Sequence, residues 1–198
     1  IAVEKEIPQK VLICAPSNAA IDEIVRRIVT DGVFGPGGEK YKPSLVRLGP
    51  NIGRDLAEYS LNAKVEKKMA ARGMQKHDNP SELKMETIQE SRIVACTLSV
   101  GGCKDLLEYP DGFDVVVVDE AAQAVEVSTL IPLSMGCKRL ILIGDPLQLP
   151  ATVFASRSVD TKFNRSLFER LQSSLPRHML GVQYRMHPYI SRFPAKEF

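Results

Sequence analysis

Residues 113–120 read Phe113-Asp114-Val115-Val116-Val117-Val118-Asp119-Glu120. The four successive valines predict a strand. Their pattern is continuous and not alternating, which is typical of a strand buried on both faces, as in a parallel sheet covered by helices. The strand ends in two adjacent carboxylates, Asp119 and Glu120. In open α/β sheets ligands bind at this carboxyl edge, so the pair is the first candidate for a functional site.

Two neighbouring carboxylates at a strand tip can divide the work of phosphoryl transfer. One can hold Mg²⁺ through its water shell, while the other orients or deprotonates the attacking water. A plain structural interpretation is also open. A helix would follow the strand, and its first turn would be acidic because the helix dipole favours negative charge there. This motif alone does not decide between the two interpretations.

Other apolar runs predict further strands of the same sheet, at residues 11–14, 93–96, 140–143 and 179–182. An amphipathic helix follows the first run, because Ile21, Ile24, Val25 and Ile28 recur at helical spacing. Ser17 or Asn18 can cap this helix, and Gly32 can end it. Strands that alternate with helices predict an α/β fold with a mainly parallel sheet.

Three segments differ from this pattern. Residues 34–44 are rich in Gly and Pro and predict a surface loop, and residues 151–165 predict a polar loop before a helix at 166–171. Residues 55–90 are strongly charged and carry only a thin apolar line at Leu61, Val65 and Met69. We expect two exposed helices there, forming a hairpin inserted into the fold that stands off the sheet. By default such an insertion is solvated and has no chemistry.

Composition excludes several classes of protein. The 198 residues are 44% hydrophobic and 25% charged, as in an ordinary soluble globular domain and unlike a disordered chain. The apolar runs are far shorter than the about 20 residues that span a bilayer. The net charge is only +2, so any nucleic-acid site must be local. The four cysteines form no CxxC motif and have no His at metal-ligand spacing, and we expect reduced thiols of the cytosol or nucleus.

Two further motifs carry polar groups that suit nucleotide chemistry. The strand at 140–143 runs into Gly144-Asp145-Pro146, a sharp turn that places Gln148 beside the tip of the preceding strand. Gln148 could hydrogen-bond a phosphate oxygen or the attacking water, or it could be an ordinary exposed turn residue. Tyr184 beside Arg185 could stack a base and pair with a phosphate. The alternative for this pair is a buried Tyr with a surface Arg.

Small polar side chains follow two of the predicted strands. Pro16, Ser17 and Asn18 come after the first strand, and Thr97 ends the strand at 93–96. Hydroxyl and amide groups at helix starts can donate to phosphate or sugar oxygens. For each of these segments taken alone, simple helix capping is the favoured interpretation.

In this order, the motifs resemble those of the superfamily 1B helicases, and most closely the senataxin-like and up-frameshift-type RNA/DNA helicases. The segments that carry the resemblance are VLICAPSNAAIDEI (11–24), CTLS (96–99), VVVVDEAAQA (115–124), LILIGDPLQLPATV (140–153), SLFERL (166–171) and QYRMHP (183–188). They cover most of the chain outside residues 32–92.

The resemblance implies a role for each motif residue. Asp119 matches the Mg²⁺-binding carboxylate, Glu120 matches the carboxylate that activates the hydrolytic water, and Gln148 matches a glutamine that contacts the γ-phosphate of ATP. Tyr184 resembles a tyrosine that stacks on the base of ATP, and Arg185 an arginine that reaches its γ-phosphate.

The same resemblance places Pro16, Ser17, Asn18 and Thr97 along a bound single strand of nucleic acid. The insertion at 55–90 resembles the helical stalk of these helicases.

A phosphate-binding loop of the form G-x-x-x-x-G-K-[ST] is absent from the sequence; the segment Gly35-Pro36-Gly37-Gly38-Glu39-Lys40 lacks the adjacent Gly-Lys. The resemblance implies that this loop and its strand precede Ile1 and that a second motor domain follows Phe198. We therefore expect residues 1–178 to be a RecA-like motor domain of the P-loop NTPase type that lacks its first strand. Residues 179–198 would begin a second such domain, and the 198 residues alone should not hydrolyse ATP appreciably.

For the parent protein the resemblance implies an ATP- and Mg²⁺-dependent helicase that moves 5′-to-3′ on single-stranded RNA or DNA and unwinds RNA/DNA hybrids. It implies a nuclear location, leaves a cytoplasmic one open, and implies no membrane partner. Two other classes stay open at this point. One is a nucleic-acid-binding module that has lost catalysis, and the other is an ATP-dependent switch without unwinding activity.

Overall fold

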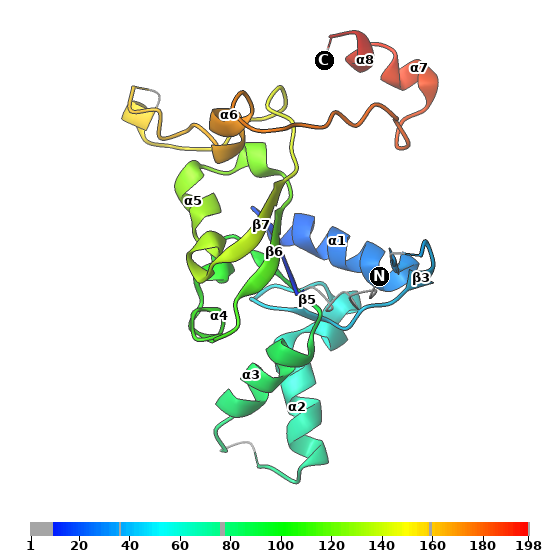
Figure 1. Ribbon diagram of the computed structural model, residues 1–198, viewed down its shortest axis with the longest axis vertical. Coiled ribbons are helices and arrows are strands. Elements are labelled where there is room, and N and C mark those ends of the chain that lie inside the picture. The colour runs from blue at the N-terminus through cyan, green and yellow to red at the C-terminus, as the bar shows by residue number, and fades with distance from the viewer. Residues whose placement is uncertain (1–9, 36, 76–77, 159, 198) are drawn as a thin grey trace, which may run out of the picture.

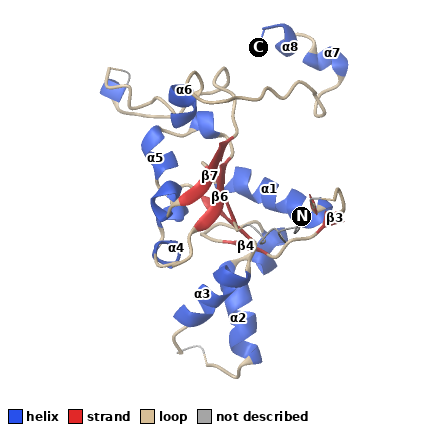
Figure 2. Ribbon diagram, in the orientation of Figure 1, coloured by secondary structure: helices blue, strands red, loops and turns tan. Residues whose placement is uncertain are grey.

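A computed structural model describes residues 10–35, 37–75, 78–158 and 160–197 of the chain. Its centre is a five-stranded sheet in the order β4-β5-β1-β6-β7, in which every neighbouring pair is parallel (Figure 1, Figure 2). The strands are β1 (Val11–Ala15), β4 (Leu45–Arg47), β5 (Ile93–Thr97), β6 (Phe113–Val118) and β7 (Cys137–Leu142). The predicted α/β fold with a mainly parallel, RecA-like sheet is thus confirmed.

Alternate side chains of the strands enter two separate cores. On one face, Leu12, Val94 and Val116 pack with residues of the three helices α2 (Leu61–Ala71), α3 (Ser81–Glu90) and α4 (Lys104–Leu107). On the other face, Ile13 and Ala95 pack against α1 (Asn18–Asp31) and the 3-10 helix η1 (Arg54–Tyr59). Burial on both faces explains why the strand sequences are continuously apolar.

Helix α1 begins and ends where its sequence predicts. The Ser17 hydroxyl accepts a hydrogen bond from the Ala20 backbone N–H at 3.2 Å, which makes Ser17 the N-cap. Gly32 ends the helix at φ 75°, and its N–H donates to the Ile28 carbonyl. A side chain at position 32 would meet the Tyr41 carbonyl oxygen at 2.7 Å, so glycine is required there for space as well as for conformation.

The charged insertion forms the expected helical hairpin, which projects from one end of the sheet in Figure 1. Its two helices are joined by ion pairs from Lys68 to Glu86 and Glu90 and from Arg72 to Glu86. The base of the hairpin is not solvated, however, because its apolar line enters the core beneath the sheet. The buried residues of the hairpin are Leu61, Val65, Leu83 and Ile88.

Several sequence expectations about strands need correction. Residues 179–182 form no strand, and Met179, Leu180 and Val182 are exposed, since no sheet partner lies beside them in the described chain. The predicted loop at 34–44 contains a small antiparallel ladder of β2 (Val33–Phe34) and β3 (Lys40–Tyr41). The three-residue strand β4 is too short to give a sequence pattern and was not predicted.

The edge strand β7 also departs from its sequence pattern. It pairs with β6 alone among the described strands, and it is covered on one face only. Ile141 and the following Ile143 are therefore 40% and 42% exposed, although the run 140–143 reads as a strand buried on both faces. An apolar strand with an open edge and an open face is unusual, because such edges pair readily with further strands.

The remaining elements are short and lie around or beyond β6 and β7. They are η2 (Val100–Gly102), η3 (Ala121–Gln123), α5 (Glu126–Leu130), η4 (Pro132–Met135), η5 (Ser156–Ser158), α6 (Leu167–Leu171), α7 (Pro188–Ser191) and α8 (Pro194–Glu197). Arg170 of α6 forms two hydrogen bonds of 2.7 Å to the Glu126 carboxylate of α5, and this fixes α6 beside the sheet. None of the helices in the described part of the chain has the length and hydrophobicity that crossing a membrane requires.

A buried ion pair links β4 to α1. Arg47, the last residue of β4, has no exposed surface, and its Nε donates to Asp22 Oδ1 at 2.9 Å. The second carboxylate oxygen of Asp22 accepts from the Gly53 N–H at 2.9 Å. The pair therefore ties β4, α1 and the segment before η1 together, and each charge is satisfied only while the other is present.

We predict that Arg47→Met lowers the free energy of unfolding by about 3–5 kcal/mol, because it leaves the Asp22 carboxylate buried without its charge partner. The double variant Asp22→Leu/Arg47→Met should recover much of this loss, since it removes both desolvated charges. Urea denaturation of both variants measures the difference. A single variant as stable as the wild type would show that the pair is not a structural tie.

Candidate functional site

The carboxyl ends of four parallel strands lie side by side at one edge of the sheet. Backbone hydrogen bonds continue the ladder past the strands, from Leu98 N to Ala15 O at 3.0 Å and from Asp119 N to Cys14 O at 2.9 Å. Ile143 N donates to Val118 O at 2.8 Å on the far side of β6. Along this edge the order is therefore the β5 end, the loop after β1, the acidic pair after β6 and the loop after β7.

Glu120 stands in a turn with an uncommon backbone. Its φ and ψ of 51° and 36° are left-handed, which for a residue with a side chain costs about 1–3 kcal/mol. The Gln123 side chain donates to Glu120 Oε2 at 2.9 Å, and the Ala121 N–H donates to the Ile143 carbonyl at 2.8 Å. Only the three-residue η3 follows. The structural interpretation of an acidic first helical turn is therefore wrong, because there is too little helix to supply a dipole.

Asp119 is suited to a hard cation. Its side chain is half-buried and makes no hydrogen bond or ion pair to another described residue, so both carboxylate oxygens are free. The described residues contain no cluster of three or more His, Cys, Asp or Glu that could hold a metal on protein ligands alone. Mg²⁺ does not need such a cluster, because it is usually bound by one or two carboxylates together with waters and substrate phosphates. The donor set therefore fits Mg²⁺ bound with a nucleotide.

The loop after β7 packs directly on the acidic turn. A side-chain carbon at Gly144 would lie 2.9 Å from Ala122 N and 3.2 Å from Ala121 N, so the two backbones touch. In the same loop, Asp145 accepts hydrogen bonds from Leu147 N at 2.9 Å and from the Gln148 side chain at 3.0 Å. Gln148 is thus brought to the loop beside Glu120, but its exposed amide is engaged within its own turn.

The structure does not bring Tyr184 and Arg185 to the acidic pair. They lie on the long connection from α6 to α7, which runs clear of the sheet in Figure 1. Tyr184 is 91% exposed, so the alternative of a buried tyrosine is wrong. The Arg185 and Met186 N–H groups both donate to Gln183 Oε1, at 2.6 and 3.2 Å, and Arg185 makes no ion pair with a described residue.

The predicted nucleic-acid contacts gather beside the acidic pair. Pro16 and Ser17 are exposed, and Asn18 is half-buried at the start of α1. Thr97 lies opposite Ala15 in the sheet register, but its side chain is mostly buried, and its hydroxyl accepts from Val100 N at 3.4 Å. Ser17 acts as the helix cap, as its structural interpretation predicts, and its hydroxyl proton remains available for donation.

Two buried thiols lie directly beneath this edge. Cys14 and Cys96 face each other on neighbouring strands with their sulfurs 3.7 Å apart. The hydrogen bond to Cys14, together with burial, raises the pKa of the Cys96 thiol well above its usual range. All four cysteines are free, as expected. Cys14 and Cys96 are unreactive, buried members of the hydrophobic core.

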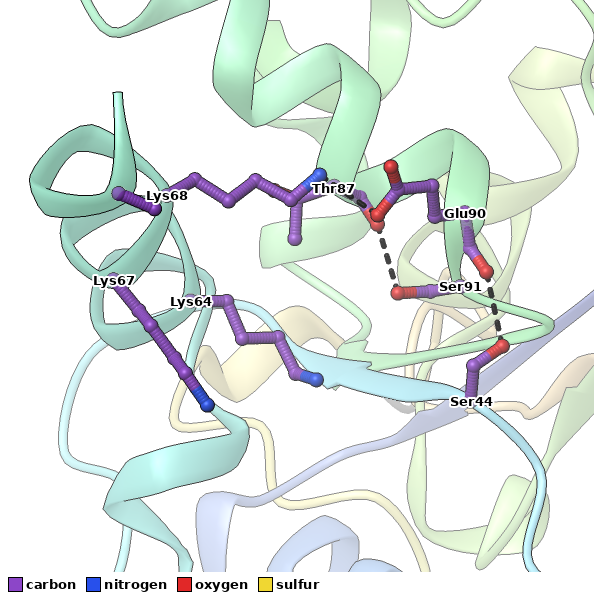
Figure 3. A pocket seen from close by; sticks show the side chains of 8 residues that line it. Ser44, Lys64, Lys67, Lys68, Thr87, Glu90 and Ser91 are labelled. Atoms are coloured by element: carbon purple, nitrogen blue, oxygen red, sulfur yellow. Dashed lines mark hydrogen bonds and ion pairs between the residues drawn. The ribbon is translucent and has the colours of Figure 1, made fainter.

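A pocket of about 380 Å³ lies away from this edge (Figure 3). Lys64 and Lys68 extend from α2 across it towards α3, and Lys68 pairs with Glu90 at 2.7 Å. Burial lowers the pKa of Lys64. Ser44 and Ser91, which precede β4 and β5, place the pocket at the amino ends of the strands. It is therefore separate from the acidic pair, and its lysines complement the carboxyl end of α3.

Comparison with known proteins identifies the family of the chain. A family model described as an AAA domain matches residues 2–85 and 75–156, and a second model, also described as an AAA domain, matches residues 163–198. The probable helicase MAGATAMA 3 of Arabidopsis thaliana is 44% identical over 196 residues, which cover 96% of this chain and 24% of the relative. The chain belongs to the senataxin- and Upf1-like helicases of superfamily 1B.

Other helicases of this family are also similar. Helicase SEN1 of Saccharomyces cerevisiae is 30% identical over 267 residues, covering 96% of this chain and 12% of SEN1. The ATP-dependent helicase upf1 of Schizosaccharomyces pombe is 30% identical over 205 residues, covering 95% and 22%. The chain thus spans about a quarter or less of the length of these relatives.

Sequence reasoning missed three residues that shape the site. Gln123 holds Glu120, Asp145 holds Gln148, and Arg47 contacts Asn18. The Gly-Asp-Pro turn is a signal for Asp145, because Asp commonly bonds the backbone two residues on. Gln123 lies three residues after Glu120, a spacing that a short helical turn brings together. Arg47 has no such signal, since its side-chain partners Asp22 and Asn18 are distant in the sequence.

We predict that Gly144→Ala lowers the free energy of unfolding by about 1–3 kcal/mol, since the added methyl group overlaps backbone atoms that cannot swing away. Gly181→Ala is a matched control, because nothing lies within 4 Å of the added carbon there. Thermal unfolding followed by circular dichroism compares the two variants. Equal midpoints would mean that the loop after β7 does not pack tightly on the acidic turn.

Proposed function

We propose that this chain is part of the motor of an ATP-dependent helicase that hydrolyses ATP, moves 5′-to-3′ on single-stranded RNA or DNA and unwinds duplexes, including RNA/DNA hybrids. The observation that carries the proposal is the shared carboxyl edge. It sets Asp119 and Glu120 between the loop that carries Gln148 and the loop that carries Pro16, Ser17 and Asn18. In this proposal, one part of the edge would bind the nucleotide and the neighbouring part would bind the nucleic acid.

The two carboxylates would have different roles in this motor. When bound, Mg²⁺ supplies positive charge to the phosphates of ATP. The free carboxylate of Asp119 would hold the ion. Glu120 Oε2 is occupied by the Gln123 amide, so Oε1 is the oxygen that would accept a proton from the attacking water. The left-handed turn would keep this oxygen at the edge.

Gln148 and Arg185 would act after rearrangement. Gln148 would exchange its bond with Asp145 for a bond to the γ-phosphate or the attacking water. Arg185, which has no ion pair with a described residue, would reach the same phosphate once its segment packs against the sheet, with Tyr184 stacking on the base. Such closure would link nucleotide binding to movement of the second motor domain that we expect from residue 179 onwards.

The open side of β7 leaves room for the phosphate-binding part of the proposed nucleotide site. Its free edge and the exposed Ile141 and Ile143 provide a place for a further strand and helix that carry a phosphate-binding loop. Without that loop the 198 residues alone would hydrolyse little ATP. We propose a nuclear location, with a cytoplasmic one also open.

The first test is Glu120→Gln in the full-length protein. We predict that hydrolysis in the presence of single-stranded RNA falls by about 10²–10⁴-fold, because the amide cannot take the proton, while ATP binding is kept. Steady-state phosphate release and titration with a fluorescent ATP analogue measure the two quantities. Hydrolysis at the wild-type rate would exclude Glu120 as the base.

The wild-type protein distinguishes the two alternative functions. If it hydrolyses ATP but single-stranded nucleic acid does not stimulate the hydrolysis, an ATP-dependent switch is favoured. If it binds single strands but hydrolyses no ATP, a binding module that has lost catalysis is favoured.

A second test concerns the guanidinium on the long connection. In the full-length protein, we predict that Arg185→Ala lowers the maximal rate by about 10³-fold or more, with a much smaller change in ATP affinity, because its charge complements the transition state. The nearby Arg192→Ala serves as a control. Normal turnover by Arg185→Ala would remove this residue from the proposed site.

A further inference from the structure

The Arg47 guanidinium bonds three acceptors, of which two lie on helix α1 and one directly follows β4. Nε donates to Asp22 Oδ1 at 2.9 Å, Nη1 donates to the Leu48 carbonyl, and Nη2 donates to Asn18 Oδ1 at 2.8 Å. The side chain is fully buried, so these bonds hold a planar group in one orientation. Only one of the three acceptors, Asn18, lies in the loop assigned to nucleic-acid contact.

The contact with Arg47 decides which way the Asn18 amide points. A guanidinium has donors only, so the atom of Asn18 that faces it must be the carbonyl oxygen. The two N–H donors of Asn18 must then point away from Arg47. No described residue accepts a hydrogen bond from them, and they are not among the buried polar atoms without a partner, so they are open to solvent. The fold thus presents a fixed pair of donors beside the acidic turn.

We propose that Arg47 is a positioning residue that orients Asn18 so that its amide N–H groups donate to a phosphate oxygen of the bound single strand. The proposal rests on the proposed function and deepens it. A phosphate oxygen is the acceptor that every nucleotide offers, and backbone contacts of this kind fix register without reading sequence. Asp22 balances the charge of Arg47, so Arg47 acts on the strand through the direction of the amide and not through its own charge.

The isosteric variant Asn18→Asp tests the direction of the amide. It keeps an oxygen for Arg47 but replaces both N–H donors by a second acceptor, which repels phosphate. In the full-length protein we expect an unfolding midpoint within a few degrees of the wild type. We expect the affinity for a fluorescent polyuridine oligonucleotide, measured by anisotropy at fixed salt, to fall about tenfold or more relative to the wild type. Wild-type affinity of Asn18→Asp would overturn the proposal.

A double-variant cycle tests whether Arg47 acts through Asn18. Arg47→Lys keeps the charge but cannot bond three acceptors in one plane, and we expect it to weaken oligonucleotide binding severalfold. In an Asn18→Ala background the same change should have no further effect, because there is no amide left to orient. Arg26→Lys, at a half-exposed arginine of α1 that does not contact Asn18, is the control.

The outcomes separate this proposal from the function beneath it. If Arg47→Lys weakens binding by the same factor with and without Asn18, Arg47 acts only through general stability and the positioning role is wrong. If the wild-type protein binds no single-stranded nucleic acid, the proposed function fails and the positioning role falls with it. The role is supported only by a stable Asn18→Asp variant that binds weakly together with a cycle in which the two effects do not add.

Discussion

The parallel pairing of β1 with both β5 and β6 is the constraint on which the rest of the structure depends. Parallel strands bring their carboxyl ends to one edge, and here backbone hydrogen bonds extend the pairing to Leu98, Asp119 and Ile143. Four loops of different chemistry are thereby fixed side by side. The acidic pair has a defined neighbour on each flank because the sheet places it there, and not because of contacts among the loops alone.

A strained backbone and a buried ion pair both lie near this edge of the sheet. Glu120 adopts a left-handed backbone that its surroundings must stabilise, and Gly144 and Gln123 supply the contacts that do so. On the other flank, the buried Arg47 and Asp22 pair joins the end of β4 to the first turns of α1. Both features cost free energy of folding, and both lie near residues that the family resemblance places in contact with ligands.

Much of the fold could be predicted from the sequence, because apolar runs such as that of β6 report burial directly. The prediction failed where burial depends on a neighbour. Residues 179–182 are apolar but have no sheet partner, β7 is apolar but open on one side, and β4 is too short to give a pattern. The end of the apolar run of β6 indicated Asp119 and Glu120 as candidates for the site. The bond between Arg47 and Asn18 could not be foreseen, because it joins residues 29 positions apart through tertiary packing.

We infer that the tips of neighbouring strands and the connection after α6 serve a single nucleotide. The most direct measurement is a structure of the full-length protein with Mg²⁺, ADP and a planar fluoride mimic of the transferred phosphate, together with a single-stranded oligonucleotide. We expect Asp119 at the metal, with Gln148 and Arg185 within hydrogen-bond distance of the mimic. A nucleotide bound elsewhere, with Arg185 still remote from the acidic turn, would contradict it.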